Sequence, residues 1–307
     1  MNTARRPLSA TAPGEAPQRP PAQPGTALEE GPYRIWAELF EQRTGVCIDR
    51  HREAFVRREL TRRLDELELD IETYLQRLAH PAVGLGEWRR LLDRLLIKET
   101  RFFRHRASHD LVRETVRRRA PGLNGASLNL WSLGCSTGEE AHALAADALT
   151  GFRDAGCPPE FAVIGTDISC AARRAARAGI YPLHALRDVD RDALAPWLEP
   201  AGTGRFHFTA ELRRHVGFVA DNLLEQRRGF FPEGLDIIFC QNVLVYFRRW
   251  RRHQALNFLA GRLKPGGLLI IGPGEGSDWR PEQLLRVRTT DVAAYRRPGS
   301  REDRGDR

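Results

Sequence analysis

The spacing of hydrophobic positions changes near the middle of the chain. In HREAFVRRELTRRLDEL the apolar residues Val56, Leu60 and Leu64 recur at helical spacing, and arginines occupy roughly the opposite side. The helical pattern continues in IETYLQRLA and EWRRLLDRLLI, and no convincing strand precedes Ser127. We therefore predict an all-α N-terminal domain over residues 31–120.

Beyond this domain, short apolar runs alternate with helical stretches. SLNLWSLG, FAVIGTDI, LDIIFC and GLLIIG are each typical of a buried strand, and helical patterns such as EEAHALAADAL lie between them. This alternation predicts an α/β domain over residues 121–297, with a largely parallel sheet covered on both faces. The segment RFHFTAELRRHVGFVADN breaks the rhythm with short alternating runs, and predicts a small β insertion around residues 203–220.

The two ends of the chain have too few large apolar residues to form a core. Residues 1–30 are rich in proline, alanine and glycine, and residues 298–307 have a similar character, so we predict two disordered tails. We find no apolar run of roughly 20 residues, no apolar block of a secretory signal and no CxxC pair among the five cysteines. We expect a cytoplasmic protein with reduced thiols, no metal site and no direct membrane insertion.

The net charge of +8 is a weak argument for a nucleic-acid partner. Lysine occurs only at Lys98 and Lys264, so 46 of the 48 basic residues are arginine, and 40 acidic residues are interspersed among them. Such a skew is typical of genome-wide compositional bias. We therefore predict that nucleic acid is not a partner.

The first predicted strand ends in a glycine turn, WSLGCSTGEEAHALA. Gly134 and Gly138 bracket this turn, which either caps the following helix or lets a ligand approach the backbone closely. Glu139 and Glu140 fall in the first helical turn, where the helix dipole favours carboxylates. The functional alternative is that one of these two carboxyl groups meets a cationic or amine-bearing ligand.

Two further strand ends carry polar groups suited to adenosine. Asp167 in GTDIS is placed either to cap the next helix or to accept hydrogen bonds from both ribose hydroxyls. Gln241 and Asn242 end the third strand, Tyr246 follows four residues later, and Asn222 precedes this strand. Each amide alone is explained by a structural role, because buried amides need partners. Since parallel sheets bind ligands at the carboxyl ends of their strands, the three ends together predict an adenosine site, although the dinucleotide fingerprint GxGxxG is absent.

Six motifs, taken together, resemble those of a known protein family. IKETRFFRH, WSLGCSTGEEAHALA, GTDIS, ADNLL, FCQNVLVYF and LKPGGLLIIGPGE, in this order and spacing, closely resemble the chemotaxis receptor glutamate O-methyltransferases, the CheR family. The resemblance runs from about residue 33 to residue 297. It implies a Rossmann-like domain that uses S-adenosylmethionine and carries a small antiparallel β insertion, preceded by the helical domain. It also implies methylation of glutamate side chains on the cytoplasmic domain of a methyl-accepting chemoreceptor, by a chain that we expect to be a monomer.

The resemblance also implies roles for individual residues. Arg104 and Tyr246 match two positions proposed to engage the substrate near the methyl group, and the helix containing RRELTRR matches a basic surface proposed to dock on the receptor. Independently of the resemblance, we expect Phe102 and Phe103 to be mainly packing groups at the junction with the sheet domain, the alternative being an aromatic face towards the cofactor. The implied cofactor contacts fall on Thr100, Arg104, Glu140, Asp167, Asn222, Leu223, Gln241 and Asn242.

Two departures from the family pattern bear on activity. The family commonly has asparagine at the position of Lys98 and arginine at that of Gln241. The Lys98 ammonium could either pair with the methionyl carboxylate of the cofactor, which makes it a further cofactor candidate, or crowd the site. An alternative function follows: a module that binds S-adenosylmethionine or S-adenosylhomocysteine and acts through protein contacts, with weak or no transferase activity.

Overall fold

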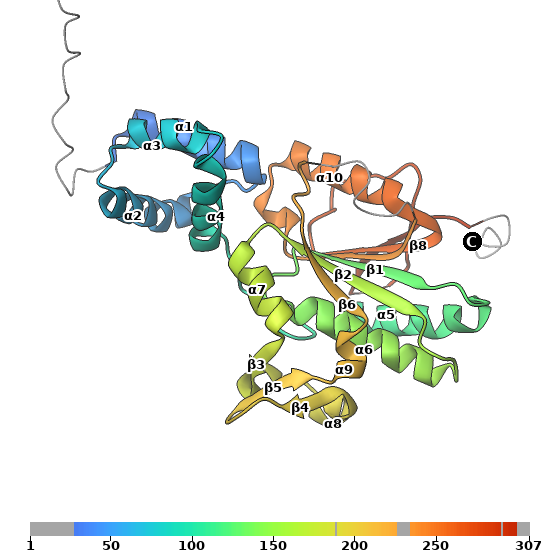
Figure 1. Ribbon diagram of the computed structural model, residues 1–307. Helices are drawn as coiled ribbons and strands as arrows, with labels where there is room; N and C mark the ends of the chain where they lie inside the picture. Colours follow the sequence, from blue (N-terminus) through green and yellow to red (C-terminus); the bar gives the residue numbers. More distant parts are fainter. Residues whose placement is uncertain (1–27, 188, 226–233, 290, 300–307) are drawn as a thin grey trace, which may run out of the picture.

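The chain folds into four N-terminal helices followed by a sheet with helices on both faces (Figure 1). Most of the two predicted tails, residues 1–27 and 300–307, lies outside the part of the chain that the structure describes. The computed structural model describes residues 28–187, 189–225, 234–289 and 291–299.

The apolar side chains of the four N-terminal helices are buried in a core that these helices share with the sheet domain. Val56, Leu60 and Leu64 are buried, as their spacing predicted, and belong to one cluster with Trp36 and Tyr74. This packing explains why a helix as rich in arginine as the second one is stable, because its apolar stripe is fully covered. The helices are α1 (Glu30–Thr44), α2 (Arg50–Leu67), α3 (Ile71–Ala79) and α4 (Gly84–Leu95).

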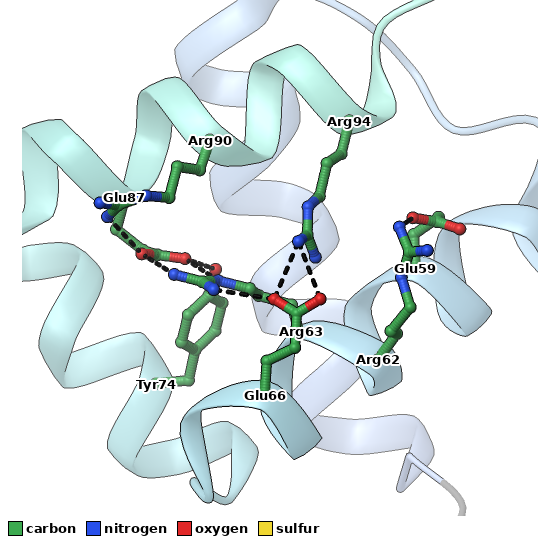
Figure 2. A network of polar contacts seen from close by, with 8 residues as sticks. All are labelled: Glu59, Arg62, Arg63, Glu66, Tyr74, Glu87, Arg90 and Arg94. Atoms are coloured by element: carbon green, nitrogen blue, oxygen red, sulfur yellow. Dashed lines mark hydrogen bonds and ion pairs between the residues drawn. The ribbon is translucent and has the colours of Figure 1, made fainter.

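A buried polar network links α2, α3 and α4 (Figure 2). Glu87 is fully buried and accepts two hydrogen bonds of 2.7 Å from Arg63 and one of 2.8 Å from the Tyr74 hydroxyl. Arg63 also donates to Glu66, which in turn accepts from Arg94 of α4. The charges of Arg63 and Glu87 therefore neutralise each other inside the helical core, and removal of either would deprive the other of its main buried partner.

The connection between α1 and α2 lies directly against the sheet domain. Gly45 ends α1 with a φ of 78°, and a Cβ at this position would lie only 2.7 Å from Cζ of Phe247. The next residue, Val46, forms an isolated antiparallel bridge with Phe247. The helical domain is thus tied to the loop that follows one of the central strands.

The sheet of the second domain has seven strands in the order β6-β2-β1-β7-β8-β10-β9, and the α/β prediction is confirmed. The first five strands are parallel, and β10 and β9 run antiparallel at one edge. One core contains residues of α1–α4, the sheet and α10, and the other contains residues of the sheet, α5, α6 and the small sheet. The elements are α5 (Arg106–Arg119), β1 (Leu128–Leu133), α6 (Glu139–Asp154), β2 (Phe161–Asp167), α7 (Cys170–Ala178), α8 (Arg191–Leu194), α9 (Ala210–Arg213), β6 (Val216–Ala220), β7 (Leu235–Cys240), α10 (Arg249–Arg262), β8 (Leu263–Ile271), β9 (Leu285–Arg286) and β10 (Ala293–Arg296).

Helix α5 packs with the sheet, although its residues were grouped with the helical domain by sequence. Val112 and Val116 are fully buried in the cluster that contains β1 and α6. The predicted helical domain of residues 31–120 therefore contains α1–α4 together with one helix of the sheet layer. Residues 96–105 form the linker between them, and this linker contains the KETRFFR motif.

The small antiparallel sheet exists, but its bounds differ from the predicted residues 203–220. It consists of β3 (Ile180–Pro182), β5 (Arg205–Phe208) and β4 (Leu198–Pro200), in that order. RFHF forms β5, whereas VGFVA forms β6 and pairs in parallel with β2 in the main sheet. Alternation shows that a strand has two unlike faces, but it does not show which sheet the strand joins.

Phe102 connects the linker to this small sheet. Its ring lies edge-on to Tyr181 of β3 at 4.9 Å and to Phe208 of β5 at 5.5 Å, and it is buried. Phe103 adopts a left-handed φ of 51° and lies edge-on to the His109 ring. Phe102 is confirmed as a packing group, and Phe103 packs against a ring of α5.

Candidate functional site

One cavity lies at the carboxyl ends of β2, β1 and β7, bounded by the linker and by the α1–α2 connection. The polar strand ends that sequence predicted therefore meet in space, as a parallel sheet requires. The cavity is lined by all ten residues proposed from sequence: Lys98, Thr100, Arg104, Glu140, Asp167, Asn222, Leu223, Gln241, Asn242 and Tyr246.

The Asp167 carboxylate is anchored by two backbone amides. The N–H of Ser136 donates to Oδ2 at 2.9 Å, and the N–H of Ser169 donates to Oδ1 at 2.7 Å. The N-cap of α7 is Ser169, whose side chain accepts from the N–H of Ala172, so Asp167 is not the helix cap. Burial raises the pKa of Asp167, and the two amides oppose that rise. The carboxylate is thus held at a fixed place, with lone pairs left for a ligand.

Glu140, and not Glu139, lines the cavity. Its Oε1 accepts a hydrogen bond of 2.6 Å from the Ser132 hydroxyl. Burial raises the pKa of Glu140 to about 8, and the neighbouring charge of Glu275 adds to the rise. Glu139 instead accepts from Thr137. A cationic or amine-bearing ligand beside Glu140 would favour its ionised form.

The amides near β7 are oriented by protein contacts. The Gln241 side chain donates to the Ser108 hydroxyl at 2.9 Å and to the Ile271 carbonyl at 3.1 Å, so it fastens α5 and β8 to the end of β7. Asn242 has a φ of 60°, and its Oδ1 lies 3.2 Å from Nε2 of His105 in the linker. The structural role that was left open for Gln241 is therefore present.

Asn222 has a comparable double contact. Its side-chain nitrogen donates to the carbonyl of Arg43 at 2.8 Å, and its Oδ1 accepts from the N–H of Leu224 at 3.1 Å. These bonds tie the loop after β6 to the last turn of α1. The neighbouring Leu223 is buried against the cavity wall.

Glu275 fixes the loop that carries Tyr246. It is buried, and its carboxylate accepts from the N–H of Val245 at 2.9 Å and from that of Gly272 at 2.7 Å. The carbonyl of Tyr246 accepts from the N–H of Cys47, so the same loop is also held by the α1–α2 connection. Glu275 is the last residue of the motif LKPGGLLIIGPGE, and its position just after an apolar strand was the one sequence signal for such a role.

Two of the three cationic side chains in the linker motif, those of Lys98 and Arg104, have different surroundings. The Lys98 ammonium donates to the carbonyl of Asp93 in the last turn of α4, where the helix dipole favours a positive charge. Arg104 lies beside Glu99, with 3.3 Å to its carbonyl oxygen and 3.7 Å to its carboxylate. The Lys98 ammonium is therefore held at the end of α4.

One family of known proteins matches this chain. The model of the SAM binding domain of CheR methyltransferase matches residues 98–292, more than half of the chain. The chain belongs to the CheR methyltransferase family. Chemotaxis protein methyltransferases of Salmonella typhimurium and Escherichia coli are 33% and 31% identical to it, each over 81% of this chain and 85% of their own length. A relative from Vibrio anguillarum is 29% identical over 88% of this chain and 98% of its own length.

The cavity of this CheR methyltransferase fits its cofactor, S-adenosylmethionine. Gly134 has a φ of 72°, and a Cβ there would lie 2.4 Å from Cγ2 of Val243, so only glycine lets the β1 turn meet the β7 loop beside the cavity. The cavity wall carries groups of the kinds that this cofactor requires: anchored carboxylate oxygens on Asp167, a carboxyl group on Glu140 and a guanidinium on Arg104.

Arg52, His105 and Ser136 are among the residues that line the cavity of this CheR methyltransferase and that sequence reasoning did not single out. His105 directly follows the KETRFFR motif, and the predicted site residues in this motif were a sufficient signal that His105 also lies at the cavity. Burial lowers the pKa of His105, so its neutral ring is the hydrogen-bond partner of Asn242. Arg52 lies on α2, far from the other motifs in sequence, and nothing in the helical pattern separates it from the other arginines.

Within the described ranges, no group of three or more histidine, cysteine or acidic side chains is arranged to hold a metal ion. Among the helices of the same ranges, none is both long enough and apolar enough to cross a bilayer.

Asp93 joins α4 to the segment that carries Asp167. Its Oδ1 accepts from the Ser169 hydroxyl at 2.6 Å and from the N–H of Ala171 at 2.9 Å. Because Ser169 is fully buried, Asp93→Ala would leave a buried donor unpaired. We expect this variant to lose about 1–3 kcal/mol of unfolding free energy, measured by urea denaturation.

The matched control for this prediction is an exposed aspartate. Asp110 on α5 pairs with Arg113 at 3.1 Å one helical turn away, and half of its side chain is exposed. Asp110→Ala should change the unfolding free energy by less than about 1 kcal/mol. Equal losses of unfolding free energy in the two variants would show that the contact between α4 and α7 stabilises the fold no more than an exposed ion pair does.

Proposed function

We propose that this CheR methyltransferase transfers the methyl group of S-adenosylmethionine to glutamate side chains on the cytoplasmic domain of a chemoreceptor, giving glutamyl methyl esters. The observation that carries the proposal is the single cavity in which Arg104 and Tyr246 lie together with the strand-end residues Asp167, Glu140 and Asn242. The chemotaxis methyltransferases that it resembles support a receptor as the substrate. We place the reaction in the cytoplasm, with a monomeric protein and without nucleic acid.

In this proposal the strand ends hold the cofactor. Asp167 accepts hydrogen bonds from the ribose hydroxyls, and Glu140 and Asn242 contact its other polar groups. Further contacts come from Lys98, Thr100, Arg104, Asn222, Leu223 and Gln241. When bound, S-adenosylmethionine supplies an electrophilic methyl group on a sulfonium.

The acceptor needs orientation rather than activation. A glutamate has a pKa of about 4.3 and is already ionised at neutral pH, so no general base is required. The protein must align a carboxylate oxygen with the methyl carbon at about 3–3.5 Å and exclude water. The guanidinium of Arg104 and the hydroxyl of Tyr246 are suited to this task, because both donate hydrogen bonds to a carboxylate.

The basic surface proposed for receptor docking on α2 is smaller than its arginine count indicates. Arg63 points into the core toward Glu87 (Figure 2), and Arg57 pairs with Glu53 and Glu30. Arg58 remains exposed, and Arg62 is exposed although it contacts Glu59. We assign docking to the outward face that carries Arg58 and Arg62.

Labelled S-adenosylmethionine with a soluble chemoreceptor cytoplasmic fragment tests the function. The expected result is base-labile label on glutamate residues of the fragment. Cofactor binding without such label would contradict the proposal and favour the alternative, a cofactor-binding module without transferase activity, which the departures at Lys98 and Gln241 motivate.

Replacement of the two substrate-orienting side chains should lower turnover more than it lowers stability. We expect Tyr246→Phe to reduce kcat about tenfold and Arg104→Ala about a hundredfold, because each removes a donor that orients the nucleophile. The checks are initial rates on the same fragment and thermal unfolding. Arg117→Ala, on the exposed side of α5, is the control that keeps the wild-type rate. Wild-type rates in both site variants would show that these roles are wrong.

A further inference from the structure

Arg52 is an arginine of the docking helix that reaches the cavity. It lies in the first turn of α2, and its side chain is half-buried at the cavity wall. Its Nη2 donates to the carbonyl of Leu95, the last residue of α4, at 2.6 Å. Its guanidinium carbon lies 5.9 Å from the centre of the Tyr246 ring. Arg52 is thus fixed by α4 and placed against the aromatic ring that we assign to the acceptor.

The bond to Leu95 uses only part of the Arg52 guanidinium. The group has five N–H donors in a planar fork that matches a carboxylate. Among the described residues, no aspartate or glutamate forms an ion pair with Arg52. The neutral carbonyl of Leu95 accepts one hydrogen bond but does not neutralise the positive charge. Within the described part of the chain, this cation at the cavity therefore has no anionic partner.

The reaction brings two carboxylates to the cavity, one on the cofactor and one on the acceptor. Of the other three cations there, Lys98 is directed to the Asp93 carbonyl, Arg104 lies beside Glu99, and Arg101 is exposed to solvent. Arg52 belongs to α2, the helix on which we place receptor docking, whereas Lys98 and Arg104 belong to the linker. Two anions that meet in a water-poor site each need a cation, and a second guanidinium meets this need.

We propose that Arg52 binds the carboxylate of the acceptor glutamate and, with Tyr246, selects an ionised side chain for methylation. This inference rests on the proposed function and adds a specificity residue to the same site. It explains how one helix serves two purposes: its outward face carries Arg58 and Arg62 for docking, while Arg52 meets the residue to be modified. A glutamine at the acceptor position has a similar shape but no charge, so Arg52 gives the site a reason to reject it.

Equilibrium binding in the presence of S-adenosylhomocysteine separates this role from a structural one. The probe is a soluble chemoreceptor fragment that the wild-type protein methylates, compared with the same fragment carrying glutamine at the acceptor position. We expect wild type to bind the glutamate form about tenfold more tightly, as a charge-assisted bidentate contact implies. In Arg52→Ala this ratio should fall severalfold, although the Arg104 guanidinium stays in place, whereas Arg117→Ala, outside both the cavity and the docking face, should keep it.

Arg52→Gln is the second variant, because it retains an N–H donor for the Leu95 carbonyl and lacks the charge. It should lose discrimination as Arg52→Ala does, while both variants keep the wild-type affinity for S-adenosylhomocysteine. A wild-type ratio in either variant would overturn the role of Arg52, and so would an equal loss of affinity for both fragments. If the wild-type protein methylates no fragment, the proposed function fails, and this inference with it, before Arg52 is tested.

Discussion

Glu87→Gln is expected to lower the free energy of unfolding by about 3–5 kcal/mol, because it removes the charge that compensates a buried arginine. Glu87 is fully buried and accepts both hydrogen bonds of the Arg63 fork. Glutamine has a single acceptor oxygen, and its amide group would face donors of the guanidinium or the Tyr74 hydroxyl. Urea denaturation followed by circular dichroism measures the loss.

Glu66→Gln is the matched control for this variant. Glu66 belongs to the same network and accepts from Arg63 and Arg94, but more than a third of its side chain is exposed. Water can replace its lost contacts, so the expected loss is below about 1 kcal/mol. Similar losses at Glu66 and Glu87 would contradict the view that burial of the charge pair decides the effect.

The same network gives the helical domain a dependence on acid. Burial raises the pKa of Glu87, but the hydrogen bonds from Arg63 and Tyr74 outweigh it, and the net pKa lies below the usual value. A carboxyl group with a lowered folded pKa stabilises above its unfolded pKa of about 4.3, and this contribution is lost as the pH falls toward the folded value. Wild type should therefore lose stability below about pH 4.3 more steeply than Glu87→Gln.

The place of the site could be predicted from sequence because it follows from sheet geometry. Asp167, Gln241 and Asn242 each follow a continuous apolar run, and adjacent parallel strands bring such ends to one edge. The choice between Glu139 and Glu140 could not be made in this way. Neighbouring helical residues point about 100° apart, and the hydroxyls of Ser132 and Thr137 show which carboxyl faces the cavity.

The hydrogen-bond partners of long cationic side chains could not be predicted from the sequence. Lys98 and Arg52 both end at carbonyl oxygens near the C-terminus of α4, those of Asp93 and Leu95. These contacts depend on how α4 stops and how the linker leaves it, which no local pattern records. The pattern of α5 had a similar limit, because an apolar stripe shows that a helix is buried on one side but not that its partner is a sheet.

Asp167→Ala is expected to weaken S-adenosylhomocysteine binding at least tenfold, since loss of even one charge-assisted hydrogen bond to a ribose hydroxyl accounts for that factor. Calorimetric titration measures the change. The same substitution also frees the amides of Ser136 and Ser169, so weaker binding alone would not identify the contact that was lost.

An analogue of S-adenosylhomocysteine that lacks both ribose hydroxyls separates the two causes by a double-mutant cycle. If Asp167 binds the hydroxyls, the analogue binds wild type and Asp167→Ala with similar affinity, because it has no group for the carboxylate to hold. If Asp167 acts only by ordering the loops through Ser136 and Ser169, the substitution weakens the analogue and the natural ligand by the same factor. That second result would contradict the ribose assignment and leave Asp167 as a scaffold of the cavity wall.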